Sequence, residues 1–247
     1  MGKIQLNTLK IITLLTEFLP FLFCVSNLKK LNTKPLKVFF IYTLLQLLTS
    51  ISIAFSIYFL NSYSLYFLIL DIHLVLEFYI ISFFYIQAYK KPLFKWISVS
   101  LALIFLLFLL FTSSFNNNQI FNSTTTLIQF LFLILFSLFY LFDYLDNVEL
   151  IPLTSNPYFF ITISLLFYFA GNFFYILLVN NSKEAEEHVQ LYLILSYSIV
   201  SIVKNILLSI SIIRLRNKSN AKDDFSTSLP NLDFQIDAIT PNQRKYL

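Results

Sequence analysis

The chain has 247 residues, of which 57% are hydrophobic and 12% are charged, whereas a soluble domain carries roughly 25% charged residues. So few charges, with a mean hydropathy of +0.74, exclude a soluble globular enzyme, a disordered chain and a collagen, and the single cysteine, Cys24, excludes a disulfide scaffold. These features predict an all-α integral membrane protein whose main partner is the lipid bilayer.

The net charge of +4 does not indicate nucleic-acid binding. The Lys and Arg residues flank apolar runs, which is where membrane topology places them. No polar segment combines a basic patch with stacking aromatic residues. We therefore predict no nucleic-acid partner.

Seven apolar runs are long enough to cross a bilayer, because a helix needs about 20 residues to span the hydrocarbon core. The runs cover residues 8–27, 38–60, 65–88, 93–114, 125–145, 157–180 and 190–213. Lysines, prolines and clusters of Asn or acidic residues separate them. We predict a polytopic membrane protein with a seven-transmembrane-helix bundle over residues 1–213, followed by a polar tail.

The orientation follows from the breaks between the runs, since short loops rich in Lys and Arg stay in the cytoplasm. One side of the predicted bundle carries Lys29, Lys30, Lys34, Lys37, Lys90, Lys91, Lys95, Arg214, Arg216 and Lys218. The other side carries only Lys3, Lys10 and Lys183. This asymmetry predicts an N-terminus outside and a cytoplasmic C-terminus, although the break at 143–156, on the cytoplasmic side, contains neither Lys nor Arg.

The polar tail, residues 214–247, has the composition of a disordered cytoplasmic segment and contains two prolines. A second interpretation rests on apolar residues that stand near its Asp residues: Phe225, Leu232, Phe234, Ile236 and Ile239. Such a segment is able to dock on a cytoplasmic signalling partner.

Three ionisable residues lie near the centres of predicted spans: Glu17, Glu77 and Lys204. A lone charge at the bilayer centre costs at least ~2.5–3.5 kcal/mol. Lys204 lies ten residues, or about 15 Å, before Arg214, so its side chain cannot reach the interface. We expect Lys204 to pair with Glu77, Glu17 or both in a shared interior site.

Polar residues at helical spacing extend this predicted site. His73 lies four residues before Glu77, on the same helix face. Gln46, Thr49 and Gln129 add polar groups from two neighbouring runs, and Gly171 allows close helix approach. The predicted intramembrane polar site comprises Glu17, His73, Glu77, Tyr168, Asn172, Ser201, Lys204 and Asn205. Three interpretations stay open: an ion pair that only fixes helix order, a pocket for a ligand, and a path for ions or protons.

Motifs for catalysis and cofactor binding are missing. Gly2 and Gly171 are the only glycines, so there is no phosphate-binding loop and no Gly-flanked serine. His73, His188 and Cys24 are too few for a multi-histidine zinc site. Serines are abundant, so a Ser–His or Ser–Lys pair stays open, but we predict no enzymatic activity, no metal and no cofactor.

Several short motifs resemble those of a known group. They are Glu17-Phe18-Leu19-Pro20, Glu77-Phe78, Pro157-Tyr158-Phe159-Phe160, Tyr168-Phe169-Ala170-Gly171-Asn172-Phe173 and Lys204-Asn205-Ile206-Leu207. In these, the chain resembles small, uncharacterised seven-span membrane proteins of Bacteroidota. The resemblance implies a location in the bacterial cytoplasmic (inner) membrane and a signalling context. Lys204 and Glu77 also fit the plan of microbial rhodopsins, but Val200 stands where those proteins usually carry an acid.

The expected function is that of a non-enzymatic sensor or accessory signalling protein that perceives a small or lipidic ligand. The alternative is a small-solute or proton-coupled transporter that uses Glu17, Glu77 and Lys204. Helix interruptions near mid-span, which transporters often use, are few here. A purely structural membrane subunit is the third interpretation.

Overall fold

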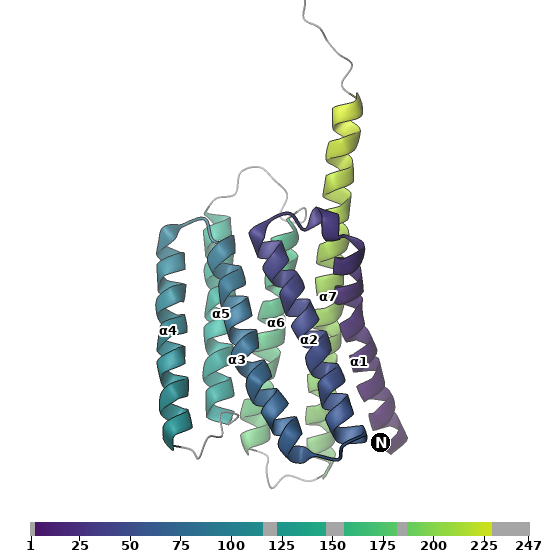
Figure 1. Cartoon of the computed structure of the whole chain (residues 1–247), viewed down its shortest axis with the longest axis vertical. Helices are drawn as coiled ribbons and strands as arrows, with labels where there is room; N and C mark the ends of the chain where they lie inside the picture. The colour runs from purple at the N-terminus through teal and green to yellow at the C-terminus, as the bar shows by residue number, and fades with distance from the viewer. Residues whose placement is uncertain (1–2, 116–122, 147–155, 182–186, 229–247) are drawn as a thin grey trace, which may run out of the picture.

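The computed structural model describes residues 3–115, 123–146, 156–181 and 187–228, and within these ranges every regular element is helical. The elements are α1 (Lys3–Ser26), the short 3₁₀ helix η1 (Leu28–Lys30), α2 (Lys34–Tyr58), α3 (Tyr63–Ala88), α4 (Pro92–Phe115), α5 (Ser123–Leu145), α6 (Pro157–Asn181) and α7 (Glu187–Ser228). Figure 1 shows that they run up and down in one bundle.

The helix starts follow local chemistry. Pro92 and Pro157 open α4 and α6, and Pro35 lies in the first turn of α2, positions where the missing N–H of proline costs nothing. Ser62 caps α3, because its hydroxyl accepts a hydrogen bond from the Leu65 N–H at 3.3 Å. Asn61 just before it has φ +46°, a left-handed conformation that Asn tolerates better than most residues.

Within the described part of the chain, six helices are long and apolar enough to cross a membrane. These spans are Lys34–Tyr58, Tyr63–Ala88, Pro92–Thr112, Ser123–Leu145, Pro157–Val179 and Leu195–Arg214. In α1 the apolar stretch Ile11–Ser26 is shorter than the others. Helices satisfy their own backbone hydrogen bonds in lipid, so the prediction of a multi-pass helical membrane protein is confirmed, with six spans by length and composition.

The principal helix contacts form a closed ring. Around it, α1 packs on α2, α2 on α3, α3 on α5, α5 on α6, α6 on α7 and α7 on α1. Helix α4 lies outside the ring and packs on α3 and α5 (Figure 1). Only 17% of its span is buried, against 33–44% for the other five. The ring therefore has an interior to which α4 contributes little.

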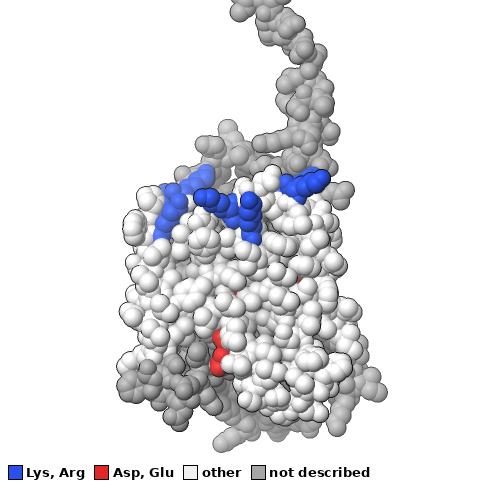
Figure 2. Space-filling view, viewed as in Figure 1, with Lys and Arg blue, Asp and Glu red and all other residues white. Residues whose placement is uncertain are grey.

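Basic side chains gather at one end of the bundle, as Figure 2 shows. This basic end carries Lys29, Lys30, Lys34, Lys37, Lys90, Lys91, Lys95 and Arg214. It is the end at which α1 and α3 finish and α2 and α4 begin. The connection between α2 and α3, at 59–62, lies at the opposite end (Figure 1).

Helix α7 extends past the predicted boundary between the bundle and the tail. It continues past Arg214 as a projecting helix to Ser228 (Figure 1). Residues 215–228 are therefore helical, whereas the sequence predicted a disordered tail from 214 onward. Residues 229–247, which include four of the five apolar residues proposed for docking, lie outside the described residues.

Aromatic side chains fill the bundle from mid-depth to the basic end. We call this group the aromatic cluster, and each of its side chains is at most 4% exposed. Its members are Phe39, Phe78, Phe84, Tyr85, Tyr89, Phe105, Phe136 and Tyr140. The ring centroids of Phe78 and Phe105 are 4.1 Å apart, and those of Phe78 and Phe136 are 6.1 Å apart. Such contacts are typical of tilted aromatic packing and leave little free space.

Buried polar groups tie the aromatic cluster to the helix ends. Tyr85 and Ser137 join their hydroxyls at 2.8 Å, and the Tyr89 hydroxyl donates to the Phe136 carbonyl at 2.9 Å. The Asp143 carboxylate, 1% exposed, accepts the backbone N–H groups of Lys90 and Lys91 at 2.6 and 3.1 Å. An acid from α5 thus fixes the connection between α3 and α4.

Candidate functional site

A cavity of about 350 Å³ lies inside the helix ring. All six ring helices line it, and α4 does not. Its polar lining consists of Glu17, Gln46, Thr49, Ser50, Tyr66, His73, Glu77, Thr126, Gln129, Tyr168, Asn172, Tyr175 and Tyr197. Ligand sites in proteins start at about this size.

The cavity extends from mid-depth toward the end opposite the basic residues. Glu77 lies near the middle of α3, whereas Tyr66 lies eleven residues, or about 16 Å, closer to the start of that helix. Tyr175 is near the last turn of α6 and Tyr197 is near the start of the α7 span. The rings of these two tyrosines are 5.3 Å apart, so aromatic side chains flank the outer part of the cavity.

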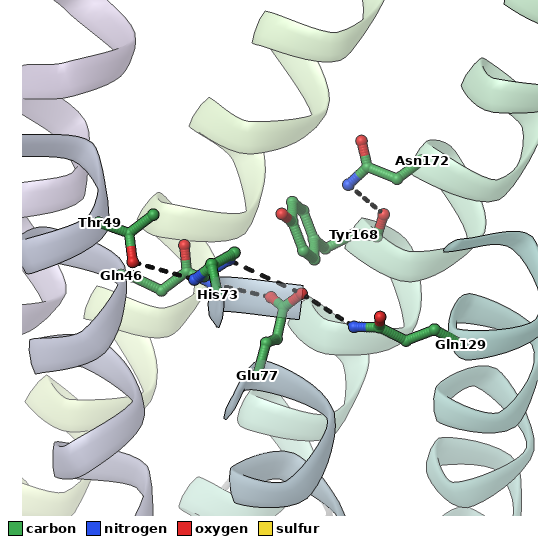
Figure 3. Close-up of polar contacts among 7 residues, drawn as sticks. All are labelled: Gln46, Thr49, His73, Glu77, Gln129, Tyr168 and Asn172. Carbon is green, nitrogen blue, oxygen red and sulfur yellow. Dashed lines mark hydrogen bonds and ion pairs between the residues drawn. The ribbon is translucent and has the colours of Figure 1, made fainter. Parts of the chain in front are cut away.

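Glu77 is the polar centre of the cavity wall (Figure 3). Its side chain is buried, and its two carboxylate oxygens accept hydrogen bonds from Gln46 Nε2 at 2.8 Å and from Gln129 Nε2 at 3.4 Å. His73 Nε2 lies 3.9 Å from Glu77 Oε2, and its Nδ1 lies 3.0 Å from the Thr49 hydroxyl. Side chains from α2, α3 and α5 therefore converge on one carboxylate.

Two amide oxygens in the cavity wall have no hydrogen-bond partner among the described residues: Gln129 Oε1 and Asn172 Oδ1. The orientation of each amide is set by its nitrogen, since Gln129 donates to Glu77 and Asn172 donates to the Tyr168 carbonyl at 2.9 Å. Both residues are at most 2% exposed. A buried polar atom without a partner costs free energy, so each is an acceptor that lacks a donor.

The predicted direct ion pair of Lys204 is not formed. Within the described part of the chain, no ion pair of 4.0 Å or less joins Lys204 to Glu77 or Glu17. The amine of Lys204 lies instead 4.3 Å from the ring centroid of Tyr168, a cation–π contact. The three ionisable groups therefore share one interior without an ion pair of 4.0 Å or less between Lys204 and either acid.

The eight residues of the predicted site separate into two groups. Glu17, His73, Glu77, Tyr168 and Asn172 line the cavity. Ser201, Lys204 and Asn205 are also buried but lie behind the wall, where α7 packs on its neighbours.

Hydrogen bonds show what the second group does. Asn205 Nδ2 donates to the Thr16 hydroxyl on α1 at 3.2 Å, and the Lys204 carbonyl accepts from Ser164 on α6 at 2.8 Å. These contacts hold α7 against α1 and α6.

Comparison with known proteins yields no relative. No family model, curated protein or solved structure matches the chain. The resemblance to seven-span proteins of Bacteroidota stays a prediction from short motifs, and the chemistry of the cavity rests on its own residues.

The lining residues Ser50, Tyr66 and Thr126 were not among the polar groups expected at the site. A signal for Tyr66 exists in the sequence, because Tyr66, His73 and Glu77 follow one helix face at spacings of seven and four. Ser50 is adjacent to Thr49 on α2, and only the packing of α1 beside α2 brings it into the wall near Glu17.

Chemically, the cavity offers hydrogen bonding, charge and aromatic faces. No three His, Cys, Asp or Glu side chains within the described ranges lie close enough together to hold a metal ion. Its acids are Glu17 and Glu77, and Gln46 and Gln129 each donate one amide N–H to Glu77.

Proposed function

We propose that the protein is a non-enzymatic membrane sensor that binds a small ligand in the cavity inside the helix ring. The observation that carries this proposal is the convergence of α2, α3 and α5 side chains on Glu77 at the inner end of a cavity of about 350 Å³. A concave, mostly preformed site with a few convergent polar groups is the usual form of a small-molecule site.

In this proposal α1 is the seventh span. It has 24 residues, which at 1.5 Å each give about 36 Å, enough to cross the hydrocarbon core. It closes the ring between α2 and α7 and supplies Glu17 to the cavity.

The basic end faces the cytoplasm in this proposal, because loops rich in Lys and Arg are retained there. The N-terminus and the outer part of the cavity then face outside, and the ligand enters from that side. The break without Lys or Arg lies beside the basic connection, since Asp146 pairs with the Lys91 ammonium group and Asp143 accepts the backbone N–H groups of Lys90 and Lys91. The resemblance to Bacteroidota proteins favours a bacterial cytoplasmic (inner) membrane.

Helix α7 is the proposed route for the signal. It contributes Tyr197 to the cavity wall and continues to Ser228 beyond the basic end, where a cytoplasmic signalling partner can contact it. The contact of α7 with α6 is close, because a Cβ added at Gly171 would lie 2.8 Å from the Val200 methyl groups. A ligand that shifts α6 therefore acts on α7 directly.

The second candidate is a transporter, favoured by the mid-depth charges of Glu17, Glu77 and Lys204. A carrier has to open its site to both sides in turn. The aromatic cluster lies between the cavity and the basic end, and its members are at most 4% exposed. This packing favours a sensor over a carrier.

Cysteine accessibility separates the two candidates. The only native cysteine is buried, so Cys24→Ser provides a cysteine-free background. In this background, Ser50→Cys places a thiol in the cavity and Ser82→Cys places one beside the aromatic cluster. Ser82 is a matched control because its hydroxyl bonds only within its own helix, to the Phe78 carbonyl.

Each variant is reconstituted in liposomes and treated from either side with a membrane-impermeant cationic methanethiosulfonate. A sensor predicts that Ser50→Cys reacts from the side opposite the basic end only, and that Ser82→Cys reacts from neither. Reaction of Ser50→Cys from both sides would establish the carrier. If Ser50→Cys is inert from both sides, the cavity is closed to solutes and both candidates fail.

A further inference from the structure

We propose that the ligand of the cavity is a small protonated amine, bound by Glu77 and by the amide oxygens of Gln129 and Asn172. The inference rests on the proposed function and names the chemical class of the ligand. Three features of the cavity support it: the charge of the interior, the unpartnered acceptors and the aromatic wall.

The interior has one more acid than base. Glu17 and Glu77 line the cavity, whereas Lys204, the one buried lysine among the residues whose burial is described, contacts the Tyr168 ring and is not in the lining. His73 is charged only when protonated. An uncompensated negative charge is expensive at membrane depth, so the cavity has to take up one positive charge, either a proton or a cation.

The hydrogen-bond inventory selects a cation that carries N–H groups. Gln129 Oε1 and Asn172 Oδ1 both lack a donor among the described residues, and a proton on a carboxyl group would leave both oxygens as they are. The Glu77 carboxylate uses two of about four lone-pair directions on Gln46 and Gln129, so it has capacity for another donor. A protonated amine offers up to three N–H donors for these acceptors, in place of the water that occupies the free cavity.

The aromatic wall suits the same ligand. Tyr66, Tyr175 and Tyr197 lie along the way from the outer end of the cavity to Glu77. Aromatic faces attract cations and also pack against an alkyl or aryl group. An anion, by contrast, would meet two acids and no lysine in the lining, which opposes its binding.

The test uses the full-length protein in lipid nanodiscs and four probes that share a phenyl group on a two-carbon chain. They are phenethylammonium, phenethyltrimethylammonium, 2-phenylethanol and phenylacetate, each titrated by calorimetry. Phenethylammonium should bind at least about tenfold more tightly than the other three, since a hydrogen bond to a charged group contributes about one to two orders of magnitude. The trimethyl probe has the same charge and no N–H groups, so it isolates the acceptors from the charge.

Three variants locate the binding. Glu77→Gln should weaken phenethylammonium binding about tenfold or more. Asn172→Leu removes an acceptor without removing a bond between helices, so it should fold and also weaken binding. Asp146→Asn changes the same charge at an exposed position of the basic end and should leave binding unchanged.

Equal binding of 2-phenylethanol, phenylacetate or the trimethyl probe would overturn the amine class while leaving a ligand cavity in place. Failure of phenethylammonium to bind at all would overturn it as well, and the reactivity of Ser50→Cys would then show whether the cavity itself stands. A loss in Asp146→Asn as large as in Glu77→Gln would place the site elsewhere. If Glu77→Gln does not fold, Asn172→Leu decides the question alone.

Discussion

The two halves of the bundle differ in how their buried polar groups are hydrogen-bonded. The aromatic half, near the basic end, holds the aromatic cluster, and the cavity half holds the cavity. Near the basic end, Tyr85, Tyr89 and Asp143 find partners within the protein, and aromatic rings fill the space between them. In the other half, Gln129 and Asn172 each keep an amide oxygen without a partner beside a cavity. The same ring helices run through both halves, so the contrast arises from where polar side chains meet one another and where they do not. Both halves contain unpartnered groups, since the buried Tyr42 and Thr162 hydroxyls near the aromatic cluster also lack a partner among the described residues. The halves differ in that a cavity lies beside the unpartnered amide oxygens of Gln129 and Asn172.

The largest expected effect on stability lies in the aromatic half, near the basic end. Asp143→Ala leaves the N–H groups of Lys90 and Lys91 without their carboxylate, and it should lower the free energy of unfolding by about 2–5 kcal/mol, since each orphaned donor costs roughly 1–3 kcal/mol. Denaturant unfolding in detergent micelles measures this. The matched control is Asp146→Ala, which removes an exposed ion pair with Lys91 and should change stability by at most about 1 kcal/mol. Equal losses in the two variants would contradict the role of Asp143.

The next effect tests the contact that joins α6 to α7. Gly171→Ala places a methyl group 2.8 Å from Val200, so the helices have to move apart, at a cost of about 1–3 kcal/mol. The double variant Gly171→Ala, Val200→Ala should recover most of that loss, because the added methyl group fills the space that valine leaves. Thermal unfolding of the single and double variants forms a complete cycle. Strictly additive losses would show that this contact is not what limits the approach of the two helices.

A smaller effect is expected at Tyr89, which joins α3 to α5. Burial raises the pKa of the Tyr89 phenol above its ordinary value, so the hydroxyl stays protonated and keeps donating to Phe136 throughout the neutral range. Tyr89→Phe should therefore cost about 1 kcal/mol of stability, equally at pH 6 and pH 9. A cost that vanishes at pH 9 would mean that the phenol ionises and that the hydrogen bond is not maintained.

The smallest effect on stability belongs to the cavity half. Asn172→Leu removes an acceptor that has no partner, so the unfolding free energy should stay within about 1 kcal/mol of the unchanged protein or rise slightly. The same variant should lose amine binding, which separates stability from function at one residue. A loss as large as that of Asp143→Ala would mean that Asn172 supports the fold.

Much of the fold follows from the sequence, because each apolar run is bounded by lysine, proline or Asn clusters. The predicted run at 65–88 and α3 (Tyr63–Ala88) end at the same residue, and the run at 157–180 differs from α6 (Pro157–Asn181) by one residue. The position of α4 outside the ring was not predictable in this way, since the central part of its run, residues 101–111, is apolar on every side and does not show which face meets a neighbour. Hydropathy also gave no sign that α7 continues to Ser228, because a helix that leaves the bundle no longer needs an apolar face.

The site was predictable only in part. Spacing along one helix placed His73 beside Glu77, since residues four apart share a face. It did not predict how Lys204 is accommodated, because an amine at a given depth can meet a carboxylate or a ring, and the rotamer decides between them. The sequence also did not show that the amide oxygens of Gln129 and Asn172 lack a donor, since this depends on how several helices pack together.

The central claim is that the cavity half holds water and the aromatic half excludes it, because a polar cavity of this size is hydrated whereas a close-packed interior is dry. Hydroxyl-radical footprinting of the unmodified protein in nanodiscs tests this directly, since the radicals form from water and oxidise the tyrosines beside it. We predict rapid oxidation of Tyr175 and Tyr197 in the cavity wall and protection of Tyr85 and Tyr140 in the aromatic cluster. Equal oxidation rates for the two pairs would contradict the account.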